Sequence, residues 1–236
     1  MAGQKKFSIL IPVYNEAKTV EKLIGQVMKV KTDGYEKEVI VVDDGSMDNT
    51  RKILQKIGKS RKYASLRIYF HPKNKGKGAA LRTALSKASG FACIVQDADL
   101  EYDPREIIML LDEMKNRKAD AVYGSRFLNR DGLHKGLFYF GNKGLTWLTN
   151  IIYGARLTDM ETCYKLVKTS LLRKLRLRAN KFDFEPEVTG KLLRHGIKIW
   201  EIPISYKNRD HDEGKKITIK DGLQAAWCLI KYRFAD

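Results

Sequence analysis

The sequence predicts an α/β fold in which helices flank a mainly parallel sheet. In the first half of the chain, apolar runs rich in Val and Ile alternate with segments whose apolar residues recur at helical spacing. The apolar runs are nearly continuous, as in strands that helices cover on both faces of a sheet. At 236 residues, and without a linker or low-complexity tract, the chain is expected to form one folded unit with a sizeable core.

The first half alternates regularly between strands and helices. The expected strands are residues 7–13, 38–43, 66–70, 91–96 and 119–124. The expected helices are residues 16–30, 48–57, 78–88 and 104–115. Asp48 or Asn49 can cap the second of these helices. Strands that alternate with helices imply right-handed crossovers and parallel pairing.

The second half is less regular. Residues 137–153 are rich in aromatic and aliphatic side chains, with Gly141 and Gly144 interrupting them. A helix is expected at 185–195, a strand at 197–206 and an amphipathic helix at 217–234. On the last helix one face is apolar and is expected to pack: Leu223, Trp227 and Ile230. The polar face is expected to point outward: Lys220, Gln224 and Lys231.

Charge and composition restrict the partners and the compartment. The formal net charge of +17 favours nucleic acid, an anionic membrane surface or phosphorylated substrates. Nucleic acid is not expected, because neither zinc-finger spacing nor an RNA-binding aromatic signature occurs. The three widely spaced cysteines are expected to pack as small hydrophobes in a reducing compartment. With no signal peptide and no apolar stretch of roughly 18–20 residues, we expect a cytoplasmic protein, at most peripheral to a membrane.

An acidic motif follows the expected strand at 91–96. Asp97 and Asp99 emerge at the carboxyl end of that strand, where open α/β sheets bind ligands, and alternation puts Glu101 on the same side. Three clustered carboxylates repel one another unless a cation lies between them. Oxygen ligands of this kind suit Mg²⁺ or Mn²⁺, whose shell a substrate diphosphate can complete. The alternative is an acidic turn that caps the helix after Pro104.

Two other strand ends and one loop carry polar residues that suit a nucleotide. Residues 14–16 project from the end of the first strand toward the position of a base or ribose. Asp43 and Asp44 end the second strand, and such an aspartate suits the N–H groups of uracil or guanine or the ribose hydroxyls. In the loop at 74–78, two glycines free the backbone to wrap an anion that Lys75 or Lys77 can neutralise. The alternatives are a turn that leads into a helix cap and a flexible basic loop.

In this order, the motifs resemble the signature of family 2 glycosyltransferases, and more narrowly of the dolichol-phosphate mannose synthase group, which glycosylates polyprenyl phosphates. The resemblance extends over nearly the whole chain. The matching segments are residues 11–16, 41–46, 74–80, 97–104, 124–126, 159–165, 202–209 and 213–217.

The resemblance implies a GT-A fold, a nucleotide-sugar donor and a divalent cation, Mg²⁺ or Mn²⁺. Residues 1–130 would bind the nucleotide sugar and residues 131–236 the acceptor. The residues implied for the nucleotide sugar are Pro12, Tyr14, Glu16, Asp43, Asp44, Lys77, Asp97 and Ala98. Asp99 and Glu101 are implied as metal ligands. The residues implied in catalysis are Asp99, Arg126, Arg209 and Lys216, the last three through the donor and acceptor phosphates.

The expected reaction is an inverting transfer of a hexosyl group to a polyprenyl or dolichyl phosphate, with GDP-mannose favoured and UDP-glucose next. A phosphate monoester, whose second pKa is about 6, is largely ionised at pH 7 and needs no general base. Glu185 and Glu187 are candidate bases if the acceptor is instead a hydroxyl of a polysaccharide or protein glycan. A non-catalytic, membrane-associated protein of the same fold is the remaining alternative.

The acceptor would be met at the surface of a membrane. Many relatives carry carboxyl-terminal transmembrane helices, whereas this sequence ends at Asp236. Residues 133–153 are expected to lie in the membrane interface, at the inner face, with Trp147, Tyr139 and Tyr153 at headgroup level and lysines 135 and 143 beside anionic lipid. The alternative is that this segment packs against the sheet. A membrane protein is a further candidate partner.

Overall fold

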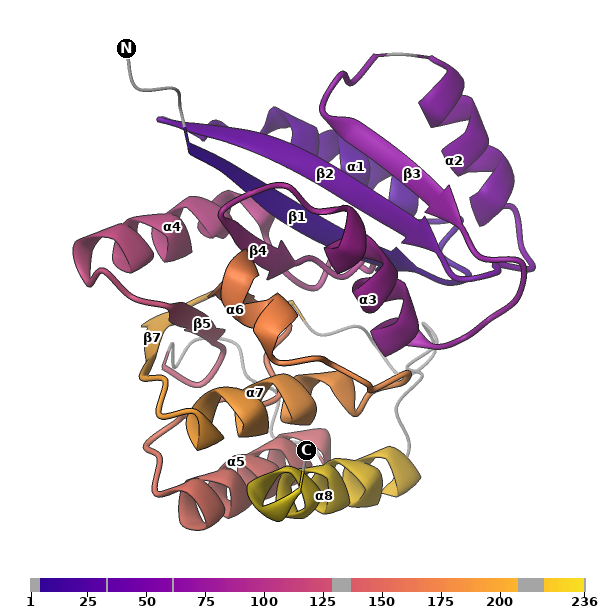
Figure 1. Cartoon of the computed structure of the whole chain (residues 1–236). Coiled ribbons are helices and arrows are strands. Elements are labelled where there is room, and N and C mark those ends of the chain that lie inside the picture. The colour runs from indigo at the N-terminus through magenta and orange to yellow at the C-terminus, as the bar shows by residue number, and fades with distance from the viewer. Residues whose placement is uncertain (1–4, 33, 61, 129–136, 208–218, 236) are drawn as a thin grey trace.

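The strands of the chain form one continuous sheet (Figure 1). A computed structural model describes residues 5–32, 34–60, 62–128, 137–207 and 219–235. In these residues the sheet has seven strands in the order β3-β2-β1-β4-β6-β5-β7. They are β1 (Lys5–Val13), β2 (Tyr35–Asp43), β3 (Leu66–Phe70), β4 (Ala92–Val95), β5 (Ala121–Ser125), β6 (Lys165–Lys168) and β7 (Ile199–Pro203). Only β6 is antiparallel to its neighbours among these strands, so the predicted mainly parallel α/β sheet is confirmed.

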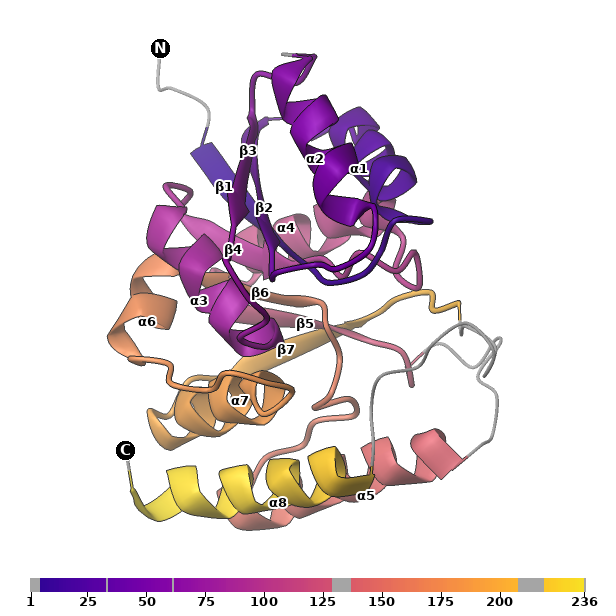
Figure 2. The ribbon, with the colours of Figure 1, turned by 90° about the vertical axis from the view of Figure 1, so that its right-hand side faces the viewer.

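Helices cover both faces of this sheet (Figure 2). On one face lie α1 (Val20–Lys29), α2 (Thr50–Lys59) and α4 (Ile107–Asn116). On the other lie α3 (Lys77–Lys87), α6 (Thr169–Lys174) and α7 (Phe184–Arg194). Because both faces are covered, the central strands are buried along their length, which explains their continuous apolar sequences.

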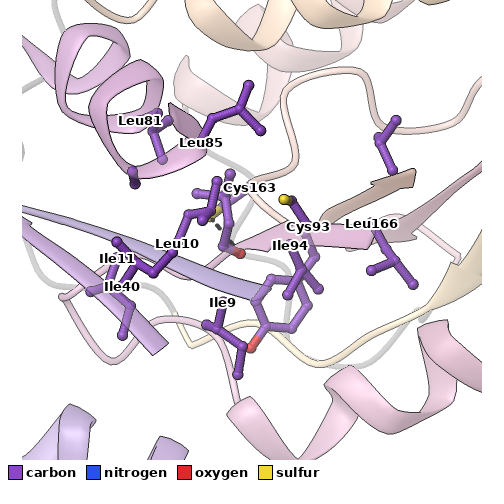
Figure 3. Close-up of a cluster of buried hydrophobic side chains, with 14 of the residues drawn as sticks. Ile9, Leu10, Ile11, Ile40, Leu81, Leu85, Cys93, Ile94, Cys163 and Leu166 are labelled. Carbon is purple, nitrogen blue, oxygen red and sulfur yellow. Dashed lines mark hydrogen bonds between the residues drawn. The ribbon is translucent and has the colours of Figure 1, made fainter. Parts of the chain in front are cut away.

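The core lies between the sheet and these helices. Ile9 and Ile40 of β1 and β2, Leu81 of α3 and Leu166 of β6 are all fully buried in it (Figure 3). Burying each such side chain stabilises the fold by roughly 1.5–3 kcal/mol relative to leaving it exposed. The three cysteines are buried and unpaired, as the sequence predicted.

Several boundaries differ from the prediction. The first helix begins at Val20 and not at residue 16, because residues 17–19 form a turn in which the Thr19 amide donates to the carbonyl oxygen of Glu16 at 3.1 Å. The strand expected at 197–206 ends at Pro203. Neither β6 nor α6 was predicted, and both are short. Before α4, a turn of 3-10 helix at Pro104–Glu106 is capped by the Asp103 side chain, which accepts from the amide of Arg105 at 2.9 Å.

Two helices form a layer of their own beyond α7. They are α5 (Leu137–Tyr153) and α8 (Ile219–Phe234), which lie side by side in both views (Figures 1 and 2). The Tyr153 hydroxyl donates to the carbonyl oxygen of Leu229 at 2.7 Å, and Arg233 Nε donates to that of Ile152 at 3.1 Å. The inner side of α8 is apolar and buried: Ala225, Cys228, Leu229 and Tyr232.

The prediction for the last helix was therefore wrong about which face packs. Leu223, Trp227 and Ile230 are 69%, 65% and 40% exposed. The sequence of α8 carries two apolar faces, and the one with smaller side chains fits against α5 and α7. No helix in the described residues is long and apolar enough to cross a membrane.

Candidate functional site

The candidate site lies where β1, β2 and β4 end, because parallel strands bring their carboxyl ends to one edge of the sheet. Val13 of β1 pairs with Asp43 of β2 at this edge. The loops that follow these two strands are joined by hydrogen bonds. The Asn15 amide donates to Ser46 Oγ at 3.0 Å, and the Glu16 amide donates to Thr50 Oγ1 at 2.8 Å. These bonds fix the loop that carries Tyr14 and Glu16, both predicted to hold the nucleoside.

Asp43 and Asp44 are buried and hold neighbouring loops in place. Asp43 accepts from the Ser46 amide at 3.2 Å and from Arg51 Nε at 3.0 Å. Asp44 accepts from the amides of Lys75 and Gly76, at 3.0 and 2.7 Å, and lies 2.6 Å from His71 Nδ1. Both carboxylates thus hold the loops at this edge of the sheet in place. Their direct contact with a nucleoside stays a prediction.

The amides of the glycine loop at 74–78 bind groups of the protein itself. The Gly76 amide is already bound to Asp44, and Gly76 has a left-handed φ of 98°. A Cβ at Gly76 would collide with the carbonyl oxygen of Asn180, and one at Gly78 would lie 2.6 Å from that of Ala179. The Ala79 amide donates to Asn180 O at 3.1 Å. The two glycines make room for backbone from the second half of the chain. That the loop also wraps a phosphate stays a prediction.

Lys77 joins the first half to the second through two carboxylates. Its Nζ lies 2.9 Å from Asp97 and 2.9 Å from Glu185. Burial opposes the charge on this lysine, but Asp97 and Glu185 outweigh it and raise the pKa of Lys77 well above its usual range. Lys77 and Asp97 were both predicted to bind the nucleotide sugar. The structure pairs them with each other and holds Asp97 in place, and Ala98 beside them is buried.

Asp99 and Glu101 have other partners than Asp97. Leu100 between them has a left-handed φ of 66°, and the Glu101 amide donates to Asp99 Oδ1 at 3.2 Å. The Glu101 carboxylate accepts from the hydroxyl of Tyr206 at 2.7 Å. In the described residues no three His, Cys, Asp or Glu side chains are grouped to hold a metal ion, so the expected three-carboxylate cluster is corrected to two. Asp99 and Glu101 still fit Mg²⁺ or Mn²⁺, which take one or two carboxylates plus water and phosphate oxygens.

Both carboxylates open into a cleft of about 1370 Å³. Its walls come from residues 15–19 and Asp48, from one side of α1 and the residues just after it, from residues 99–105 and from residues 205–207. Basic side chains line the same cleft: Lys18, Lys22, Lys29, Lys31, Arg105 and Lys207. Divalent-cation ligands next to a basic rim provide the two kinds of group that a diphosphate requires.

Arg126 is buried next to this cleft and is held by Asp159. Its Nε and Nη2 donate to the two oxygens of that carboxylate at 2.7 and 2.8 Å. Burial opposes the charge on Arg126, but Asp159 more than compensates and raises the pKa of the guanidinium. The guanidinium carbon lies 5.1 Å from the centre of the Tyr206 ring. The predicted catalytic positions Arg209 and Lys216 lie outside the described residues, and Pro12 is half-buried at the end of β1.

Two charged residues that the sequence did not single out lie close to Arg126. Burial, reinforced by Glu185, raises the pKa of Glu161 to about 7, and its buried Oε1 has no hydrogen-bond partner in the described residues. Lys165 is buried, and its Nζ donates to the carbonyl oxygens of Met160 and Thr162. Glu161 lies in the segment 159–165 that matched the family signature. This match was the feature of the sequence that could have identified Glu161 as a site residue.

Glu187, named as a candidate base, has a structural role. It accepts from the amides of Arg178 and Ala179 at 2.9 and 2.7 Å and pairs with Lys191 Nζ at 2.9 Å. A carboxylate with these partners is positioned to hold the loop before α7. Glu185, the other candidate base, is bound to Lys77.

The order of these motifs agrees with a known family. The profile of Glycosyl transferase family 2 matches residues 8–176. The chain belongs to this family. It is therefore a glycosyltransferase, and its mostly parallel sheet with flanking helices matches the GT-A arrangement of solved structures.

Relatives of this family 2 glycosyltransferase occur in archaea and bacteria. An uncharacterized protein of Methanocaldococcus jannaschii is 31% identical over 96% of this chain and 99% of its own length. The dodecaprenyl-phosphate galacturonate synthase of Rhizobium johnstonii is 27% identical over 89% of this chain and 61% of its own length. The glucosyl-3-phosphoglycerate synthase of Mycobacterium tuberculosis, crystallised with Mn²⁺, UDP and phosphoglyceric acid, superposes with a TM-score of 0.70 at 20% identity, over 98% of this chain and 80% of that one.

Proposed function

We propose that this family 2 glycosyltransferase moves a hexosyl group from a nucleotide sugar to a polyprenyl or dolichyl phosphate, with inversion at the anomeric carbon. The observation that carries the donor half of this proposal is the cleft in which Asp99 and Glu101 face a basic rim. A lipid-phosphate acceptor is supported by the name of the Rhizobium relative and by the order of the motifs.

A divalent cation held by Asp99 and Glu101 would offset the charge that develops on the leaving diphosphate. Support for a cation comes from the oxygen-only donor pair and from the Mn²⁺ and Mg²⁺ complexes of the mycobacterial synthase. Either ion satisfies this chemistry.

The chain's own residues would then supply position and charge. Tyr14, Glu16 and the loop fixed by Asp44 would hold the nucleoside, and Lys77 would keep Asp97 beside the sugar. Arg105 and Lys207 on the rim would bind phosphate oxygens, while Arg126, Arg209 and Lys216 would receive the acceptor phosphate. Since that phosphate is already largely ionised at pH 7, catalysis consists mainly of positioning and electrostatic stabilisation.

GDP-mannose is the first donor to test, because the motifs resemble those of the dolichol-phosphate mannose synthase group. UDP-glucose is the second, since a strand-terminal aspartate suits uracil as well as guanine. We place the enzyme in the cytoplasm, peripheral at the inner face of the membrane that contains its lipid acceptor. An anionic membrane surface is the expected partner, and a membrane protein is a further one.

A hydroxyl of a polysaccharide or protein glycan is the alternative acceptor. Such an acceptor needs a general base, whose pKa works best near the operating pH. Glu161, with a pKa of about 7, suits this role better than Glu187, which is bound to backbone amides. The remaining alternative, a non-catalytic protein, does not fit a chain that belongs to this enzyme family.

The test is a donor screen on the purified chain with Mn²⁺ or Mg²⁺ and a short-chain polyprenyl phosphate. GDP-mannose, UDP-glucose and UDP-N-acetylglucosamine are supplied in turn, and release of GDP or UDP is measured. We expect release that requires the lipid phosphate and disappears with EDTA or in Asp99→Asn. Release that is equally fast without the lipid phosphate, or that starts only with a sugar acceptor, would contradict the lipid-phosphate acceptor.

A further inference from the structure

The α5/α8 pair presents an apolar outer face. This face consists of side chains that are between 40% and 81% exposed: Phe140, Trp147 and Ile151 of α5 and Leu223, Trp227, Ile230 and Phe234 of α8. They recur at spacings of seven and four residues on α5 and of four, three and four on α8, so each set forms one stripe. Exposed apolar side chains that gather on one face of a protein mark an interaction site.

The opposite sides of the same helices are already packed. On α8, Leu229 and Tyr232 are buried, and the pair is joined by hydrogen bonds to backbone carbonyls of Ile152 and Leu229. Tyr153, which was expected at headgroup level, points inward, since its hydroxyl bonds Leu229 and lies against Gly190. Of the segment 133–153 that was expected in a membrane interface, residues 133–136, with Lys135, lie outside the described residues. From residue 137 on, α5 exposes one apolar stripe only, and α8 adds a second one.

Charge identifies the partner. No Asp or Glu occurs between residues 137 and 157, and Asp221 is the sole acidic residue of α8. Lys143, Lys220, Lys231 and Arg233 are the basic residues of the two helices. A basic rim around Trp, Phe and Leu side chains is typical of helices that lie in the plane of an anionic membrane interface. A second copy of the chain would bring like charges together, which disfavours a homodimer through this face.

We propose that the outer face of α5 and α8 docks the enzyme on an anionic lipid surface, with Trp147 and Trp227 inserted at headgroup level. This inference deepens the proposed function, because it names the surface that would bring the cleft to a lipid acceptor. Docking itself requires neither donor nor acceptor, so it can be tested separately from turnover.

The binding experiment is co-sedimentation of the full chain with phosphatidylcholine vesicles, with and without 30% phosphatidylglycerol. We expect binding that requires the anionic lipid and that weakens at least tenfold in Trp147→Ser/Trp227→Ser. Met109→Ser is the matched control, because Met109 is a 45% exposed apolar residue on α4, at a distance from this face. Circular dichroism and thermal melts check that all variants are folded. Equal binding of the double variant and the wild type would overturn the proposal.

The three tryptophans provide a second readout. Trp200 is half-buried under Arg117 and Lys198, and Trp147 and Trp227 lie on the docking face. Vesicles that carry a spin-labelled lipid should quench Trp147 and Trp227 in a Trp200→Phe chain, and should not quench Trp200 in the Trp147→Ser/Trp227→Ser chain. Quenching of Trp200 alone, or a dimer that the double variant converts to a monomer, would contradict docking on lipid. If the protein binds vesicles but transfers no glycosyl group, the result supports the docking face and contradicts the proposed function.

Discussion

Tyr206 and Glu101 are joined by a 2.7 Å hydrogen bond in which the phenol donates to the carboxylate. The next residue, Lys207, donates its amide to the backbone oxygen of Glu101 at 2.9 Å, so the segment that leaves β7 holds Glu101 at two points. The ring of Tyr206 also lies beside Arg126. One tyrosine thus connects the expected cation ligand with the buried arginine.

Tyr206→Phe should lower the affinity for Mn²⁺ in the presence of UDP by about tenfold, since outer partners of metal ligands typically contribute 10–100-fold. The ring and its contact with Arg126 remain in this variant. Free Mn²⁺ is measured by electron paramagnetic resonance. Tyr123→Phe is the control, because it loses a buried hydroxyl contact to Thr189 away from the cleft. An additive loss when Tyr206→Phe is combined with Glu101→Gln would show that Tyr206 does not act through Glu101.

Lys77→Met should destabilise the fold by about 3 kcal/mol, because it leaves the carboxylates of Asp97 and Glu185 close together without their cation. Urea denaturation of the two proteins measures the difference. Lys75→Met, at an exposed position in the same loop, should change the free energy of unfolding by less than about 0.5 kcal/mol. A loss of similar size in both variants would mean that the ion pairs of Lys77 carry no special weight.

Gly78→Ala should cost about 1–3 kcal/mol, since its Cβ would lie 2.6 Å from the carbonyl oxygen of Ala179 and the backbone there has to move. Gly58→Ala in α2 meets only the tip of Ile68, at 3.6 Å, and should be neutral or stabilise by up to about 1 kcal/mol. The midpoint of thermal unfolding distinguishes the two. Equal midpoints for the two variants would contradict the view that close packing requires a glycine at position 78.

The stability of the fold should fall as the pH rises from about 5 to 8, through Glu161. Burial raises the pKa of Glu161 from 4.5 to about 7, so between these values the folded state holds a proton that the unfolded state has released. That contribution is complete below pH 4.5 and is lost as the pH passes 7. In Glu161→Gln the decline should be smaller by on the order of 1–3 kcal/mol. Urea denaturation at pH 5 and pH 8 measures it, and equal declines would contradict the assignment.

The regular first half could be predicted because its signals are local. Continuous apolar runs such as β2 and amphipathic helices such as α1 are visible within ten residues of sequence. The four residues of β6 and the six of α6 are too short to show a period. The packing face of α8 could not be decided, since both of its faces are apolar and only α5 and α7 select one.

The candidate site could likewise be predicted only in part. Strand ends located the acidic residues at one edge of the sheet, as expected for a parallel arrangement. Asp97 and Glu101 have different partners, since Lys77 with Glu185 holds the first and Tyr206 the second, and these partners approach from other parts of the chain. Contacts between residues 20 to 108 positions apart leave no local pattern to read.

The strand order also has a consequence for how the chain is made. β6 lies between β4 and β5, although it is synthesised about 40 residues after β5 ends. Until Lys168 has left the ribosome, β4 and β5 each present an unpaired edge, and unpaired edges invite pairing with other chains. The late antiparallel strand therefore joins the two parallel parts of the sheet, and a nascent chain that stops before it would be prone to aggregate.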